Sequence, residues 1–220
     1  MLNTLTEQLI TIPAGGVTLE GDLVIPPKAR AVVVFAHGSG SSRHSPRNRY
    51  VAGVLQEAGI GTLLFDLLTR DEDTLYENRF DIDLLTERLK AATLWLGKQP
   101  QAEGFALGYF GASTGTASAL RAAADLGPAI SAVVSRGGRP DLAEQALPRI
   151  HAPVLLIVGG NDSVVIDLNR RAYAMIGSEK HLAIIPGATH LFEERGALEE
   201  AARLAAEWFK RHLQPASESV

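Results

Sequence analysis

The sequence of 220 residues contains no cysteine, which excludes disulfide bonds, a cysteine nucleophile and thiolate ligands for a metal. It also lacks an excess of positive charge, because 21 Lys and Arg residues against 25 Asp and Glu residues give a formal net charge of -4. Such a chain has no general electrostatic attraction to nucleic acid or to an acidic membrane surface. We therefore expect neither as a partner, and any nucleophile must be another residue type.

Long apolar runs are absent as well. No run approaches the roughly 20 residues that a membrane-spanning helix needs. Residues 1–16 do not combine a basic stretch with an uninterrupted apolar one, as a secretory signal would. The sequence therefore predicts a soluble, cytoplasmic protein. Hydrophobic residues make up 46% and charged residues 21%, which suits a single domain over residues 1–220 with a flexible tail at 214–220.

The distribution of apolar residues predicts a mostly parallel sheet. Residues 8–13 and 17–25 flank Ala14-Gly15-Gly16 and predict an antiparallel hairpin, because glycine accepts the positive φ of a tight turn. Continuous apolar runs follow, which are typical of strands buried on both faces. These predicted strands are residues 31–36, 60–64, 105–110, 130–134, 154–158 and 182–185.

Amphipathic segments lie between these strands. Apolar residues recur in them at spacings of three or four, which indicates helices that cross over between parallel strands. The clearest are residues 85–96, 116–126, 168–176 and 197–213. The predicted fold is a doubly wound α/β domain with an eight-stranded sheet, an N-terminal hairpin and about six helices on the two faces.

The segment Gly111-Ala112-Ser113-Thr114-Gly115 carries the strongest chemical signal. It matches the pattern G-x-S-x-G between a predicted strand and a predicted helix, where this motif forms a strained turn that exposes the serine hydroxyl. A side chain at either glycine position would collide with the adjoining strand or helix. We interpret Ser113 as a nucleophile. The alternative is an ordinary strand-to-helix turn in which the serine caps the helix.

A serine nucleophile needs a base and an acid that orients the base. Asp162 follows the predicted strand 154–158 and His190 follows the strand 182–185, so each lies just past the carboxyl end of a strand. The chain order serine, aspartate, histidine is the one expected for α/β hydrolases. Asp66, at the end of another apolar run, is the rival to Asp162 as the acid.

A second glycine-rich segment, His37-Gly38-Ser39-Gly40, follows the predicted strand 31–36. This loop can place the backbone N–H of Ser39 beside that of Thr114, and each donor to a tetrahedral oxyanion is worth about 3 kcal/mol. The alternative is a glycine-rich turn without a ligand. Arg43 stands where a dinucleotide fingerprint needs its third glycine, and the chain has no P-loop motif. We expect no cofactor and no metal.

Several arginines fall in predicted loops after strands, at the edge of the sheet that should carry the site. Their guanidinium groups can bind a substrate carboxylate or phosphate. The interpretation that we prefer is surface ion pairing with nearby acidic residues, which contributes little energy. These arginines are Arg43, Arg47, Arg49, Arg70, Arg136 and Arg139. We take His37, Gly38, Arg136 and Arg139 as the candidate substrate-binding residues.

From the first hairpin to the last helix, the chain resembles small α/β hydrolases of the dienelactone hydrolase group. The match rests on the segments 37–40, 111–115, 160–162 and 187–190. Founding members of the group use a cysteine nucleophile on a cyclic lactone, whereas this sequence has Ser113. Some relatives that carry Ser-Arg-Gly-Gly-Arg-Pro, here residues 135–140, are fused to a phosphoribosyltransferase domain, which these 220 residues do not encode.

The resemblance implies a serine hydrolase that cleaves small carboxylic esters or lactones without a cofactor. Little chain is left for a large lid after residue 135, because a helical segment begins near Asp141. An open site of this kind suits short acyl groups. Two alternatives stay open: an amidase or peptidase with the same triad, and a non-catalytic binding or regulatory module. The oligomeric state stays open as well.

Overall fold

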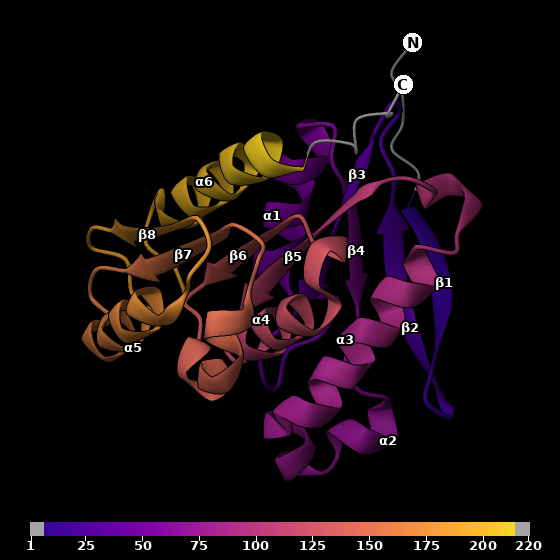
Figure 1. The fold of residues 1–220 in the computed structure, drawn as a ribbon, viewed down its shortest axis with the longest axis horizontal. Helices are drawn as coiled ribbons and strands as arrows, with labels where there is room; N and C mark the ends of the chain where they lie inside the picture. Colours follow the sequence, from indigo (N-terminus) through magenta and orange to yellow (C-terminus); the bar gives the residue numbers. More distant parts are fainter. Residues whose placement is uncertain (1–6, 214–220) are drawn as a thin grey trace.

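The computed structural model describes residues 7–213. Within them, eight strands form one sheet in the order β1-β2-β4-β3-β5-β6-β7-β8 (Figure 1). The tail predicted at 214–220 lies outside the described residues. The strands are β1 Glu7–Ala14, β2 Val17–Val24, β3 Ala31–Ala36, β4 Gly61–Phe65, β5 Ala106–Ala112, β6 Ala132–Arg136, β7 Val154–Gly159 and β8 Lys180–Ile185.

The sheet confirms the predicted fold class. Strands β1 and β2 form the predicted antiparallel hairpin, and Gly15 and Gly16 in its turn have φ of 56° and 90°. Strand β2 also runs antiparallel to β4, whereas all pairs from β4 to β8 are parallel. Parallel strands bring their carboxyl ends to one edge of the sheet, where α/β folds place their sites.

Helices cover both faces of the sheet (Figure 1). Helices α1 and α6 pack against each other on one face, and α3, α4 and α5 lie on the other. No helix formed by residues 7–213 is long and apolar enough to cross a membrane. The helices are α1 Pro46–Glu57, α2 Arg70–Asp73, α3 Ile82–Leu96, α4 Gly115–Leu126, α5 Ser163–Met175 and α6 Ala197–His212, with short 3-10 turns η1 Tyr76–Phe80, η2 Pro100–Ala102, η3 Gly127–Ala129 and η4 Pro140–Arg149.

Helix α1 corrects one detail of the sequence prediction. Arg47 and Arg49 lie within this helix, Arg70 begins α2 and Arg136 ends β6, so these four arginines are not in loops. The hydroxyl of Ser45 accepts the N–H of Asn48 and so caps α1. The buried residues of α1 have helical spacing, but the first of them, Asn48, is polar. The pattern of apolar residues alone therefore does not indicate where this helix begins.

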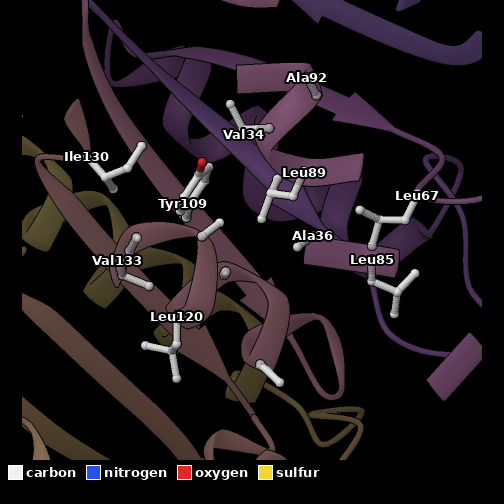
Figure 2. Packing of buried hydrophobic residues seen from close by; sticks show 14 of the residues in the cluster. Val34, Ala36, Leu67, Leu85, Leu89, Ala92, Tyr109, Leu120, Ile130 and Val133 are labelled. Atoms are coloured by element: carbon white, nitrogen blue, oxygen red, sulfur yellow. The ribbon is translucent and has the colours of Figure 1, made fainter. Parts of the chain in front are cut away.

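The core beneath α3 and α4 holds the central strands in place. Tyr109 of β5 is fully buried there among aliphatic side chains that include Val34, Leu89 and Leu120 (Figure 2). Its hydroxyl lies 2.6 Å from the hydroxyl of Thr93 in α3, so the polar atom in this apolar cluster is satisfied. The core thus ties β5, which leads to Ser113, rigidly to the helices.

Candidate active site

Ser113 lies in the turn between β5 and α4, as the motif predicts. Its φ is +50°, a conformation that non-glycine residues rarely adopt. Close contacts explain why the motif has glycine at both of its other fixed positions. A Cβ at Gly111 would lie 2.6 Å from the Cα of Thr116, and a Cβ at Gly115 would lie 2.2 Å from the carbonyl oxygen of Ala36. The close approach of β3, β5 and α4 therefore requires glycine at both positions.

His190 lies between Ser113 and Asp162. Its Nε2 is 3.4 Å from the Ser113 hydroxyl oxygen, and its Nδ1 donates to Oδ2 of Asp162 at 2.7 Å. With the proton on Nδ1, the neutral ring presents an unprotonated Nε2 to the hydroxyl. The Asp162 side chain is 15% exposed, whereas that of His190 is 39% exposed and accessible to a substrate. The three side chains are thus arranged as a chain of nucleophile, base and orienting acid.

Asp66, the rival acid, has different partners. Its carboxylate accepts the backbone N–H of Arg43 at 2.8 Å and also binds the guanidinium of Arg43. The structure therefore places Asp162 against His190 and engages Asp66 in an ion pair on the loop after β3.

The loops after β7 and β8 are joined by their backbones. The N–H of Gly160 donates to the carbonyl of Ile185 at 2.8 Å, and the N–H of Asn161 donates to that of Ala188 at 2.9 Å. A Cβ at Gly159 would lie 2.5 Å from the Ala188 oxygen, so only glycine allows this approach. These contacts bring the loop that carries Asp162 against the loop that carries His190.

The two predicted oxyanion donors lie on neighbouring segments. No acceptor among the described residues takes the backbone N–H of Thr114. The backbone N–H of Ser39 donates to the hydroxyl of Thr114 at 2.8 Å. Sequence reasoning missed this hydroxyl, although a threonine directly after the serine was the available signal. The Thr114 side chain thus holds the loop after β3 close to the serine turn.

His37 is buried and fixes the backbone around it. Its Nε2 accepts the N–H of Leu67 at 3.0 Å, and its Nδ1 donates to the carbonyl of Gly38 at 2.9 Å. Burial lowers the pKa of His37, so the neutral ring is favoured. Gly38 adjoins the nucleophile, since a Cβ there would lie 3.1 Å from that of Ser113. Both ring nitrogens of His37 are therefore engaged within the protein, and Gly38 is the part of this loop that touches Ser113.

A pocket of about 270 Å³ opens at Ser113 and His190. Arg136, the last residue of β6, lines this pocket and is 8% exposed. Arg139 does not line it and instead binds Asp141 through two hydrogen bonds of 2.9 and 2.7 Å. The contact with Asp141 raises the pKa of Arg139. Of Arg136 and Arg139, the structure brings Arg136 alone to the candidate site.

Comparison with known proteins decides the family. The model of the dienelactone hydrolase family matches residues 19–216, which is most of the sequence. The chain belongs to the dienelactone hydrolase family. A dienelactone hydrolase from Anabaena variabilis, known from its crystal structure, has 54% sequence identity to this chain. The two structures superpose with a TM-score of 0.93 over 96% of this chain and 99% of the Anabaena chain.

Two further comparisons extend this picture. Est1E from Butyrivibrio proteoclasticus is 18% identical, has a TM-score of 0.80 over 92% of this chain and 98% of its own, and shares the fold. A Mycobacterium tuberculosis protein named "Putative phosphoribosyl transferase" is 56% identical over 209 residues, or 95% of this chain and 47% of its own length. The chain thus spans about half the length of the curated relatives it matches. Family and fold agree, because members of this family have the α/β-hydrolase fold that the chain shows.

Proposed function

We propose that this dienelactone hydrolase family member cleaves carboxylic esters or lactones with Ser113, His190 and Asp162. The observation that carries the proposal is the continuous contact from the Ser113 hydroxyl through the imidazole of His190 to the carboxylate of Asp162. At 3.4 Å the Ser113 hydroxyl and Nε2 of His190 lie close enough for proton transfer once a bound substrate tightens the contact.

The reaction follows from these positions. Ser113 Oγ attacks the carbonyl carbon while its proton passes to Nε2 of His190, and Asp162 stabilises the resulting imidazolium. We expect the N–H groups of Thr114 and Ser39 to donate to the oxyanion, for which the Ser39 N–H must leave the Thr114 hydroxyl that it binds at 2.8 Å. The alcohol leaves with the proton from His190. Water, deprotonated by His190, then releases the acid from Ser113.

The segment after β6 supports a preference for short acyl groups. Between β6 and β7 the chain forms the 3-10 turn η4, which packs against α4 and α5 and not over Ser113. This segment therefore offers no surface that would enclose a long acyl chain, and the pocket at Ser113 has a volume of about 270 Å³. We therefore expect turnover of p-nitrophenyl butyrate to exceed that of the palmitate ester.

Two other functions deserve a direct comparison. Amide or peptide hydrolysis uses the same groups, so matched anilide and ester substrates must be assayed side by side. The transferase name of the Mycobacterium tuberculosis relative belongs to a protein about twice as long. The contact between Ser113 and His190 favours hydrolysis over phosphoribosyl transfer or a binding role for this chain, because neither of these needs an activated serine.

Labelling with a fluorophosphonate tests the proposal. The probe should modify Ser113, as mapped by mass spectrometry, and S113A should lose both the adduct and ester turnover by several orders of magnitude. The butyrate and palmitate esters are assayed with the same preparations. A folded wild-type protein that takes no label on Ser113 would overturn the assignment and favour a binding module. Equal turnover of the two esters would contradict the short-chain preference alone.

A further inference from the structure

The backbone after β6 is bonded to the backbone of the nucleophile. The N–H of Ser113 donates to the carbonyl oxygen of Arg136, and the N–H of Arg139 donates to the carbonyl oxygen of Ser113, each at 3.1 Å. Residues 136–139, which we call the clamp segment, thus hold the peptide groups on both sides of Ser113. They belong to the glycine-rich motif at 135–140, to which the chemistry proposed above gives no role.

The strained turn at Ser113 needs such support. A residue with φ of +50° keeps this conformation only where the surrounding structure holds it there. The Ser113 carbonyl also accepts the N–H of Thr116, but that hydrogen bond lies within the turn and the helix that follows it. The bonds that tie the Ser113 backbone to a different part of the chain are those to the clamp segment.

The clamp segment also lies against the base. Gly137 has φ of +54°, and a Cβ there would lie 3.3 Å from the carbonyl oxygen of His190 and 3.5 Å from its ring atom Cε1. The N–H of Gly137 donates to the carbonyl of Ile157 in β7 at 2.8 Å. A single segment therefore contacts the backbone of the nucleophile and the loop that carries the base.

A side chain of α5 anchors the clamp segment. Asn169 is fully buried, and its Nδ2 donates to the carbonyl of Gly138 at 3.0 Å and to that of Val165 at 2.8 Å. Val165 belongs to the same helix, so the bond to Gly138 is the one that leaves it. Helix α5 begins directly after Asp162, whose carbonyl accepts the N–H of Ile166 at 2.9 Å. The helix thus connects the clamp segment to the acid that orients His190.

Packing alone does not explain an asparagine at this place. Its Oδ1 is buried and has no hydrogen-bond partner among residues 7–213, which costs free energy. The other buried residues on this part of α5 are apolar: Val165, Ile166 and Ala172. An apolar residue would avoid the unpaired oxygen, whereas only a donor can bind the Gly138 carbonyl. The hydrogen bond to Gly138 is therefore what the amide contributes.

We propose that Asn169 is a positioning residue for hydrolysis at Ser113. It acts through the carbonyl of Gly138, which anchors the clamp segment, and this segment keeps the turn of Ser113 aligned with His190. The inference rests on the proposed function, because it assigns Asn169 to the same reaction. Asn169 is not among the residues that line the pocket at Ser113, so its loss should slow the chemical step and leave substrate binding nearly unchanged.

Kinetics of two variants test this role. N169L removes the amide but keeps the branching of the side chain. For p-nitrophenyl butyrate, its kcat should fall about tenfold or more while KM stays within about threefold, because a small misplacement of the nucleophile slows the chemical step. N169S should show the same loss, since its one hydroxyl proton bonds the Val165 carbonyl within the helix and leaves Gly138 without this donor.

A matched control removes an amide far from the site. Gln56 of α1 donates through Nε2 to the hydroxyl of Thr62 at 2.7 Å, at the amino end of β4 and thus opposite the edge that carries Ser113. Q56M also breaks a hydrogen bond between the side chain of a helix and the rest of the chain. It should keep the wild-type kcat and KM.

Amide hydrogen exchange, followed by NMR, measures the turn without any turnover. In N169L and N169S the N–H of Ser113 should exchange about tenfold faster or more than in wild type, relative to the N–H of Val34 in the core, because the turn opens locally. In Q56M the two rates should keep the wild-type ratio. If wild type cleaves no ester, the proposed function fails, and faster exchange at Ser113 still supports the anchoring by Asn169.

Two results would overturn the inference. One is a folded N169L or N169S that retains the wild-type kcat, and the other is a Ser113 N–H that exchanges in these variants as it does in wild type. Circular dichroism establishes folding, and N169S decides the matter if N169L does not fold.

Discussion

At the scale of single residues, the contacts of each acidic side chain separate the two candidates for the acid. Asp162 accepts from Nδ1 of His190 at 2.7 Å, whereas Asp66 neutralises Arg43. The carboxylate of Asp162 fixes the tautomer and orientation of the imidazole, whereas that of Asp66 anchors the loop after β3. The two aspartates should therefore respond differently to the same isosteric change.

Replacing each aspartate by asparagine tests this difference. D162N should lower kcat for ester hydrolysis by about 10⁴-fold, because the amide no longer stabilises the imidazolium and favours the wrong tautomer. D66N removes a charge from the pair with Arg43 and should affect stability more than kcat. Steady-state kinetics of both folded variants provide the comparison. A larger loss of kcat in D66N than in D162N would exchange the two assignments.

At the scale of elements, the site depends on how closely β3, β5 and α4 approach one another. Gly115 begins α4 directly against the carbonyl oxygens of Ala36 and His37, where a Cβ would lie 2.2 and 2.4 Å away. Gly53 lies inside α1 with nothing within 4 Å of an added Cβ. The same substitution thus meets a backbone contact in one helix and open space in the other.

Alanine at these two glycines should have opposite effects on stability. G115A should lower the free energy of unfolding by about 3 kcal/mol or more, since strand and helix must separate to admit the methyl group. G53A should raise it by about 1 kcal/mol through the better helix propensity of alanine. Urea denaturation followed by circular dichroism measures both. Unchanged stability in G115A would show that the approach of α4 to β3 is not tight.

At the scale of the whole molecule, buried ionisable groups make stability depend on pH. Burial lowers the pKa of His37 below its ordinary value of 6.5, although the charges of Asp66 and Asp73 oppose this effect. Burial likewise lowers the pKa of His212, near Glu179 and Arg211. The unfolded chain binds protons on these rings at a higher pH than the native protein does. The stability that these two neutral rings contribute is therefore full above about pH 6.5 and falls as the pH drops below it.

The variant H37Q isolates the contribution of His37. Its amide oxygen can accept the N–H of Leu67 in place of Nε2, without a titrating group. Between pH 7.5 and 5.5, wild type should lose more unfolding free energy than H37Q, and His212 accounts for part of the slope that remains. Denaturant titrations at several pH values measure the two slopes. Equal slopes would mean that His37 is protonated alike in the native and unfolded protein.

Patterns along the chain were enough to predict most of the fold. Buried parallel strands read as apolar runs, and the turn after Ala14 needs glycine, so the hairpin and all strands of the sheet were found. Helix α1 was not singled out because the first residue of its buried face is the polar Asn48. The positions of Ser113, Asp162 and His190 past strand ends followed from motif and order, and their catalytic roles stay predictions for the labelling experiment.

The sequence by itself determined the fold class and the group of residues at the carboxyl ends of the strands, because periodicity and motif spacing are local properties of the chain. Only the tertiary structure decided which carboxylate meets His190, that the Ser39 N–H binds the hydroxyl of Thr114, and that Asn169 binds the carbonyl of Gly138. Those facts depend on distances between residues far apart in the sequence, which packing of the loops sets and spacing along the chain does not encode.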